Sequence, residues 1–178
     1  MAETLILVDE NDNVIGFGDK EKCHDSPGTL HRAIAVFVFN GDGKILIQQR
    51  SRFKRLWPLI WDNTASSHPY PNENYQSSSE RRLVEELGFK CPLRYVFKFT
   101  YHAPYKDIGA EREMCAVLAG QHDGKVIANP KEVADWKYVD PKDLKADMER
   151  HPEKYTPWFI IAYNRLWKEH PDVLGLDA

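Results

Sequence analysis

The chain has 178 residues, of which 42% are hydrophobic and 29% are charged, which is ordinary for a globular protein with one sizeable core. Its formal net charge of -3 argues against a nucleic-acid-binding surface, and no apolar stretch is long enough to cross a membrane. Three cysteines and a start without a signal-peptide pattern predict a reduced, cytoplasmic protein, which we expect to be monomeric.

The first part of the chain predicts strands joined by tight turns. Apolar residues 5–8 and 14–18 flank a segment rich in turn formers, which is typical of an N-terminal β-hairpin. After a loop, residues 33–39 predict a buried strand. A turn with two glycines then reverses the chain into a second strand over residues 45–49.

The second part predicts helices and further strands. A helix over residues 75–87 should end at Gly88, because glycine favours helix C-termini. Strands are expected over residues 93–101, 111–119 and 136–139, and helices are expected to begin at Pro141 and near Pro157. This order predicts an α/β fold with a mixed sheet sandwiched between helices (α/β/α). We expect residues 1–178 to form one domain whose C-terminal helix covers a pocket.

The predicted helix at residues 75–87 lies in the charged segment ENYQSSSERRLVEELGF, which resembles the Nudix box G-x5-E-x7-R-E-U-x-E-E-x-G-U, where U is aliphatic. The pattern positions are filled by Glu73, Arg81, Leu83, Glu85, Glu86 and Gly88. Carboxylates on one side of a helix offer hard oxygen ligands to Mg²⁺, and Mg²⁺ bridges diphosphate oxygens. A solvated helix with Arg–Glu pairs at i and i+4 gives the same local pattern, so the segment alone does not decide between a metal site and a charged surface.

Two positions depart from the Nudix pattern. Ser67 stands where the first glycine belongs, and Arg82 stands where the first glutamate of R-E belongs. Nudix pyrophosphatases typically use that glutamate to hold catalytic metal. A cation at this position removes a metal ligand and adds a diphosphate donor, which favours binding a diphosphate without cleaving it.

A second group of candidate ligands lies outside this segment. Two carboxylates two residues apart on a predicted strand point to the same face, and three histidines lie elsewhere in the chain. The members are His24, His31, His68, Glu111 and Glu113. Three imidazoles and two carboxylates suit an octahedral Mn²⁺ or Mg²⁺ site, or a bound Zn²⁺. Each histidine taken alone is more often a surface or hydrogen-bonded residue than a metal ligand.

These residues stand in local contexts that resemble type 1 isopentenyl-diphosphate isomerases, in the same order along the chain. The contexts are K-x3-H-x6-H from Lys20 to His31, W-P-x2-W-x-N from Trp57 to Asn63, S-H-P from Ser67 to Pro69, E-x-E from Glu111 to Glu113, and P-W at Pro157 and Trp158. The resemblance implies a Nudix fold and a metal site at the five His and Glu residues. It also implies that Lys20, Arg50, Lys54 and Arg82 hold a substrate diphosphate, although residues 50–55 also fit a solvated basic loop.

The reaction that the resemblance implies moves the double bond of isopentenyl diphosphate to give dimethylallyl diphosphate through a carbocation-like intermediate. It needs an acid and a base on opposite faces, a dry pocket and an electron-rich neighbour for the cation. Glu113 is expected to carry one proton with Tyr101 as a relay, and Trp158 to shield the cation. Glu86 is expected to hold Mg²⁺ on the diphosphate. As alternatives, Tyr101 is a packed strand residue and Trp158 a core aromatic at a helix start.

One departure bears directly on this reaction. The family carries a cysteine in a context like N-x2-C-x-H-P, and this chain has Ser66 at that position. A thiol exchanges protons near neutral pH, whereas an alcohol is much harder to ionise, so Ser66 needs help to act as a proton relay. Three outcomes follow: an isomerase with slower turnover, which we favour, a paralogue with a different prenyl or diphosphate substrate, or a protein that binds diphosphate without isomerising it.

Two functions therefore stand beside the isomerase. One is a Nudix pyrophosphatase acting on a nucleoside or prenyl diphosphate, which the helix supports and Arg82 with the three histidines opposes. The other is a non-catalytic diphosphate-binding module, suggested by Ser66. The expected ligand in each case is a small diphosphate rather than a nucleic acid or a membrane.

Overall fold

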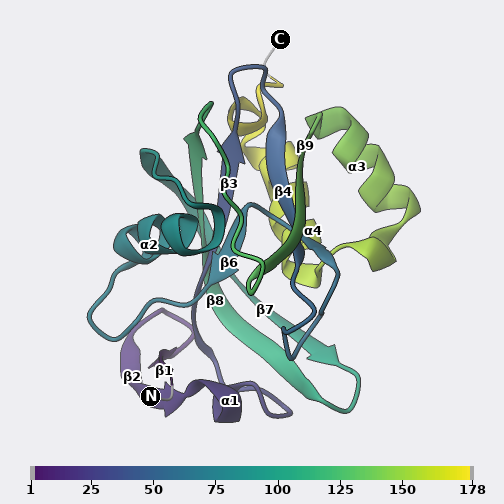
Figure 1. The fold of residues 1–178 in the computed structure, drawn as a ribbon. Helices are drawn as coiled ribbons and strands as arrows, with labels where there is room; N and C mark the ends of the chain where they lie inside the picture. Colours follow the sequence, from purple (N-terminus) through teal and green to yellow (C-terminus); the bar gives the residue numbers. More distant parts are fainter. Residues whose placement is uncertain (1–2, 177–178) are drawn as a thin grey trace.

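The computed structural model describes residues 3–176, which form one mixed nine-stranded sheet with helices on both sides (Figure 1). The strands are β1 Thr4–Val8, β2 Val14–Asp19, β3 His31–Phe39, β4 Ile45–Arg50, β5 Trp61–Asp62, β6 Ala65–Ser67, β7 Leu93–Tyr105, β8 Gly109–Gln121 and β9 Val133–Val139. The α-helices are α1 Lys20–Cys23, α2 Tyr75–Leu87, α3 Pro141–Arg150 and α4 Pro157–Glu169, and short 3₁₀ turns cover Pro152–Lys154 and Pro171–Leu174.

Strand β3 is the central strand of the sheet. It pairs in parallel with β8 over its whole length and antiparallel with β1, β4 and β6. Eight of its nine residues are buried, because helices or neighbouring strands cover both of its faces. The parallel register places His31 beside Glu113, and the antiparallel register of β6 places Ala35 beside Ser66.

The two faces of the sheet carry separate apolar clusters. Ile34 and Val36 of β3 point to one face and pack with Leu83 and Leu87 of helix α2. Alternate residues such as Phe37 point to the other face, where α3 and α4 supply further apolar side chains. Figure 1 shows α2 on one side of the sheet and α3 and α4 on the other, which confirms the predicted α/β/α arrangement.

Helix α2 has the bounds that the apolar periodicity predicts. Asn74 caps its N-terminus by accepting a hydrogen bond from the Ser77 backbone N–H. At the other end Gly88 adopts φ 75°, the left-handed conformation that a glycine accepts at no steric cost. Of the helices within residues 3–176, none is both long enough and apolar enough to cross a membrane.

Several element boundaries differ from those expected. Strand β7 extends to Tyr105 and strand β8 begins at Gly109, because the two strands stay paired up to the turn that joins them. The short strands β5 and β6 and helix α1 were not predicted, because two to four residues carry no readable period. His24 is the C-terminal cap of α1, and His31 is the first residue of β3.

Candidate active site

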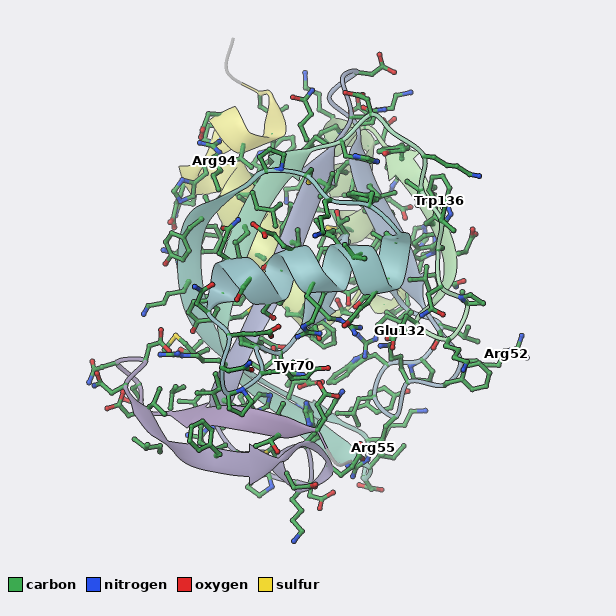
Figure 2. The ribbon with its side chains drawn as sticks, turned by 60° about the vertical axis from the view of Figure 1, so that its left-hand side comes forward. Arg52, Arg55, Tyr70, Arg94, Glu132 and Trp136 are labelled. Atoms are coloured by element: carbon green, nitrogen blue, oxygen red, sulfur yellow. The ribbon has the colours of Figure 1, made fainter. Side chains whose placement is uncertain are left out.

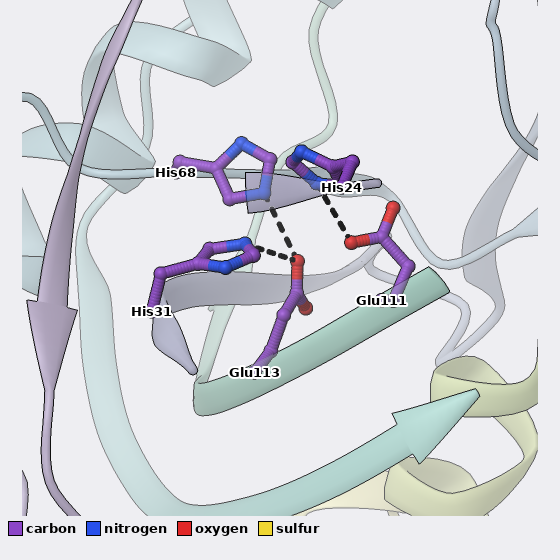
Figure 3. A group of neighbouring side chains, drawn as sticks. All are labelled: His24, His31, His68, Glu111 and Glu113. Atoms are coloured by element: carbon purple, nitrogen blue, oxygen red, sulfur yellow. Dashed lines mark hydrogen bonds and ion pairs between the residues drawn. The ribbon is translucent and has the colours of Figure 1, made fainter. Parts of the chain in front are cut away.

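Five buried His and Glu side chains from separate parts of the chain meet at one end of the sheet (Figure 3). One ligand atom from each of His24, His31, His68, Glu111 and Glu113 lies within 4.8 Å of the others. His24 Nε2 lies 2.8 Å from Glu111 Oε2. Glu113 Oε1 lies 3.0 Å from His68 Nε2 and 3.5 Å from His31 Nε2. The strand register brings His31 and Glu113 together, and the E-x-E spacing adds Glu111 on the same strand face.

Backbone carbonyls orient two of the imidazoles. His24 Nδ1 lies 2.7 Å from the Lys20 carbonyl oxygen, and His31 Nδ1 lies 2.7 Å from the Thr29 carbonyl oxygen. A hydrogen bond of this kind fixes the ring and leaves Nε2 directed into the cluster. Metal-bound histidines in proteins commonly use their second nitrogen in this way.

The donor set of the cluster fits a divalent cation. Among the described residues, His31 Nε2 faces the cluster and is buried without a hydrogen-bond partner. Such orphaned atoms are costly unless something else satisfies them. Ligand atoms on opposite sides of an ion with bonds of about 2.1 Å stand about 4.2 Å apart, so the cluster needs only a slight contraction to hold one. Three nitrogens and two carboxylates supply both borderline and hard ligands.

The protonation of the cluster follows from burial and from the facing carboxylates. Burial lowers the pKa of His24, but its contact with Glu111 outweighs that and raises the pKa to about 9. Burial and the charges of the other two histidines hold the pKa of His68 well below 6.5. Burial opposes ionisation of Glu113, but His31 and Tyr101 offset it and lower the pKa of this carboxyl below its usual value. At neutral pH the Glu113 carboxylate is therefore charged and His68 is neutral, whereas His24 carries a proton that a bound cation would have to displace.

A cavity of about 250 Å³ opens next to this cluster. His24, His68, Glu111 and Glu113 form part of its wall, while Leu56, Tyr101 and Trp158 line a less polar part. Ser66 and Ser67 of β6 also line it. The cavity thus joins a charged wall to an aromatic one, as a ligand with a charged head and a small hydrocarbon tail requires.

Cations surround the same cavity, and each is paired with a carboxylate. Lys20 Nζ lies 2.7 Å from Glu3 Oε2. Glu132 pairs with both Lys54 and Arg82. In Figure 2, Glu132 is labelled below helix α2 and Arg55 lies nearer the N-terminal strands. Burial raises the pKa of Glu132, but the charges of Lys54 and Arg82 outweigh it and lower the pKa to about 2. We call Lys20, Lys54 and Arg82 with Glu3 and Glu132 the cation rim.

Comparisons with known proteins identify the family of the chain. The NUDIX domain model matches residues 29–159. Isopentenyl-diphosphate Delta-isomerase 2 of Aromatoleum aromaticum is 40% identical over 93% of this chain and 87% of its own length. Isopentenyl-diphosphate Delta-isomerase 1 of Photorhabdus laumondii is 37% identical over 97% of this chain and 99% of its own. The chain belongs to the isopentenyl-diphosphate Delta-isomerase family.

Solved structures agree on the fold of this isomerase-family chain. A Deinococcus radiodurans protein has a TM-score of 0.77 and 23% identity, covering 93% of this chain and 100% of its own. A MutT protein from Methanosarcina mazei Go1 has a TM-score of 0.63 and 16% identity, covering 79% of this chain and 96% of its own. These likenesses confirm the predicted Nudix fold.

The Nudix helix of this family member keeps its charged residues engaged with one another. Arg81 Nε donates to Glu73 Oε1 at 2.7 Å, and Arg81 Nη2 donates to the His68 carbonyl oxygen at 3.1 Å. Glu86 is 2% exposed and lies behind Arg82, which donates to Glu86 Oε1. Its other oxygen accepts from Gln48 Nε2 at 2.7 Å. Glu86 is therefore outside the His/Glu cluster, and in this conformation Arg82 separates it from the cavity.

Arg50, which the resemblance assigns to the diphosphate, makes most of its contacts with the protein itself. Its Nε donates to the Trp57 carbonyl oxygen and its Nη2 to the Leu56 carbonyl oxygen, both at 3.0 Å. Its Nη1 lies 3.3 Å from Asp62 Oδ2. Arg50 therefore braces the loop that precedes β5 while it lines the cavity.

Tyr101 contacts Glu113, and Trp158 and Ser66 line the same cavity. Tyr101 Oη donates to Glu113 Oε2 at 2.5 Å, a contact that their antiparallel register allows. Burial and the charge of Glu113 raise the pKa of Tyr101, so its hydroxyl keeps its proton. Trp158 Nε1 donates to Ser66 Oγ at 3.2 Å, and the Tyr101 and Trp158 ring centroids are 5.9 Å apart.

No sequence pattern identified three carboxylates that lie near the cavity. Glu3 and Glu132 line the cavity and pair with the rim cations, and Asp62 is fully buried beside Ser66. Glu132 precedes a predicted strand and looks like an ordinary exposed residue there. Asp62 offers a weak signal, because it lies four residues before Ser66 in a segment already assigned to the site.

Proposed function

We propose that this protein converts isopentenyl diphosphate to dimethylallyl diphosphate. The observation that carries the proposal is the placement of Glu113 at the junction of the His/Glu cluster and an aromatic-walled cavity bordered by the cation rim. The family relationship supports the same assignment, because relatives at 37–40% identity carry this name. The cavity volume of about 250 Å³ suits a five-carbon diphosphate.

The metal proposal assigns His24, His31, His68, Glu111 and Glu113 as ligands of Mn²⁺, Mg²⁺ or Zn²⁺. A bound divalent cation supplies positive charge that fixes the cluster and offsets the charge of the two carboxylates. The chain itself prepares the site, because carbonyl oxygens orient His24 and His31 and Arg81 holds the backbone of His68.

The diphosphate is proposed to bind at the cation rim. Lys20, Lys54 and Arg82 exchange their carboxylate partners for phosphate oxygens, and Arg50 contributes charge from behind. When Arg82 turns to the phosphate, Glu86 is released and is proposed to reach a Mg²⁺ ion on the diphosphate. In the present conformation Glu86 is held by Arg82 and Gln48, so this role requires that movement.

The proton transfers are proposed to occur from two sides of the hydrocarbon. Glu113, with Tyr101 donating to it, delivers a proton to the alkene on one side. Ser66 accepts a proton on the other side, where the resemblance places a cysteine. The indole face of Trp158 lowers the energy of the intervening cation, and such contacts are typically worth about 0.5–2 kcal/mol. Burial of Tyr101 and Trp158 keeps water away from the cation.

The surroundings of this activity are also proposals. The three cysteines, Cys23, Cys91 and Cys115, are buried and unpaired, which agrees with a reducing compartment, and we propose the cytoplasm. The partner is a small prenyl diphosphate, with no nucleic acid or membrane, and we propose that the chain acts as a monomer.

The test is an isomerase assay on purified protein with isopentenyl diphosphate and either Mg²⁺ or Mn²⁺. Dimethylallyl diphosphate should form, and Glu113→Gln should lower kcat by at least about 100-fold because it removes a proton carrier. Phosphate release should not accompany product formation, since Arg82 occupies the position of a hydrolytic metal ligand. If no product forms under either metal condition, the proposal is wrong.

One observation favours a second function, a diphosphate-binding protein without turnover. Ser66 is an alcohol where a readily ionised group is expected. On this alternative the wild type binds isopentenyl diphosphate without converting it, and Ser66→Cys gains activity from an undetectable start. Measurable turnover by the wild type excludes this alternative.

A further inference from the structure

Asp62 is a fully buried carboxyl group that none of the roles described so far uses. It ends the two-residue strand β5, its exposed fraction is 0%, and it lies behind Ser66 rather than in the cavity wall. Burying a carboxylate is costly unless hydrogen bonds and an opposite charge compensate. The surroundings of Asp62 supply both.

One oxygen of Asp62 collects hydrogen bonds from two parts of the chain. Asp62 Oδ1 accepts from the Asn63 backbone N–H at 2.9 Å, from Thr156 Oγ1 at 2.9 Å and from Trp158 Nε1 at 2.8 Å. Arg50 Nη1 faces the other oxygen at 3.3 Å. Thr156 and Trp158 belong to the start of helix α4, so Asp62 joins that helix to the sheet directly behind the reacting end of the cavity.

The hydroxyl of Ser66 has two acceptors within reach and one donor that holds it. Ser66 Oγ lies 2.9 Å from Asn63 Oδ1 and 3.4 Å from Asp62 Oδ1. Trp158 Nε1 is shared between Asp62 Oδ1 at 2.8 Å and Ser66 Oγ at 3.2 Å. Rotation of the hydroxyl turns its proton from Asn63 to Asp62, and catalytic hydrogen bonds are often long before substrate binds.

We propose that Asp62 is the proton acceptor behind Ser66, so that the serine hydroxyl relays a proton between the substrate and Asp62. The inference rests on the proposed isomerase function. The substrate C–H bond breaks and its electron pair becomes the new π bond. The proton moves to Ser66 Oγ while the proton of the hydroxyl moves to Asp62 Oδ1, and Asp62 becomes a carboxylic acid. Trp158 then donates to Ser66 alone, and the proton returns through Ser66 to water after product leaves.

This relay answers the difficulty that an alcohol is hard to ionise. Because the two protons move together, no free alkoxide has to form, and the base is in effect the carboxylate. Burial raises the pKa of Asp62 against the opposing charge of Arg50, which makes it a stronger base than an exposed aspartate. Asp62 does not touch the substrate, so it is a positioning residue that acts through Ser66.

The alternative is that Asp62 only fastens helix α4 to the sheet. Asp62→Asn tests this in two backgrounds, wild type and Ser66→Cys, because a thiol ionises by itself and does not need the carboxylate. In the wild-type background, kcat should fall by about 100-fold while KM stays within about 3-fold, the range expected for loss of a general base. In the Ser66→Cys background, the same change should lower kcat by less than about 5-fold.

Thr156→Val is the matched control. It removes a hydrogen bond to the same Asp62 oxygen without touching Ser66. We expect a loss below about 5-fold that is equal in both backgrounds, because Ser66 and its contact with Asp62 remain in place. If Asp62→Asn does not fold, as judged by circular dichroism, Asp62→Ser repeats the comparison with a smaller side chain.

The outcomes separate this inference from the proposed function. If the wild type turns over and Asp62→Asn lowers kcat equally in both backgrounds, or not at all, the relay is wrong and the isomerase assignment stands. If the wild type is inactive and Ser66→Cys is active, then Ser66 and Asp62 do not form a working relay. Inactivity of both proteins overturns the proposed function and the relay with it.

Discussion

The two charged regions that border the cavity, the His/Glu cluster and the cation rim, differ in whether their charged groups already have partners. In the His/Glu cluster the groups are almost fully buried, and some of their atoms lack a partner within residues 3–176. In the cation rim each positive group already has a carboxylate, as Lys20 has Glu3 and Lys54 has Glu132. On the proposed function, the cluster is therefore a site that gains an ion, whereas the rim is a site that exchanges partners.

This difference has an energetic consequence. A buried group without a partner costs free energy that a bound ion recovers, so the cluster couples ion binding to folding. A rim cation that leaves a carboxylate for a phosphate loses one ion pair and gains another, so its net contribution to binding is smaller. The following predictions test the contrast, beginning with the largest effect.

His31→Ala should break the cluster. The side chain is fully buried, and its removal deletes one ligand and leaves Glu113 short of a partner. We expect Mn²⁺ affinity to fall by at least about 100-fold, beyond what loss of a supporting contact costs. Isothermal titration with Mn²⁺ measures this directly. The control is His151→Ala, a half-exposed histidine away from the cluster, which should leave the affinity unchanged.

Arg82→Lys should weaken substrate binding without damaging the chemistry. A lysine keeps the charge but loses the two-pronged contact with carboxylate or phosphate, so KM should rise by about 10-fold while kcat changes by less than about 3-fold. Steady-state kinetics with isopentenyl diphosphate provide the measurement. Arg52→Lys, in the exposed part of the neighbouring loop, should leave KM unchanged. An equal rise in KM for Arg52→Lys would mean that the effect of Arg82→Lys does not show a contact between Arg82 and the diphosphate.

Glu132→Gln should change the response of stability to acid. The folded-state pKa of Glu132 is lowered from 4.5 to about 2, so its contribution is fully present above pH 4.5 and is lost as the pH falls toward 2. We expect the wild type to exceed the variant in free energy of unfolding by on the order of 2 kcal/mol at pH 6, with a smaller gap at pH 3. Urea unfolding at the two pH values measures both gaps. A gap that is constant with pH would mean that the rim pairs contribute through packing alone.

Glu3→Gln should produce the smallest change. The variant releases Lys20 from a partly exposed ion pair, and such pairs contribute about 0–1 kcal/mol, so KM should fall by about 2-fold to 3-fold. Glu149→Gln, which releases Lys145 on helix α3, is the control and should leave KM unaltered. A rise in KM for Glu3→Gln would show that Glu3 positions Lys20 rather than competing for it.

Local patterns in the sequence predicted the elements with clear periods. Helix α2 follows from an apolar stripe with Leu83 and Leu87 and from a stop at Gly88, and the structure has the same bounds. The short strands β5 and β6 had no such pattern, although they carry Asp62 and Ser66. Residue identity suggested a set of metal ligands from isolated motifs, but the convergence of His31 and Glu113 depends on the parallel register of β3 and β8.

By itself, the sequence determined which residue types were available, their spacing on each element and the resemblance of the motifs, because these are properties of short segments. Only the tertiary structure decided which charges face each other. Glu132 reaches Arg82 across 50 positions of the chain, and Asp62 meets Trp158 across 96. Such contacts follow from strand register and helix docking, which are set by burial of the whole core rather than by neighbouring residues. The partners of a buried charge are therefore fixed only when the core is complete.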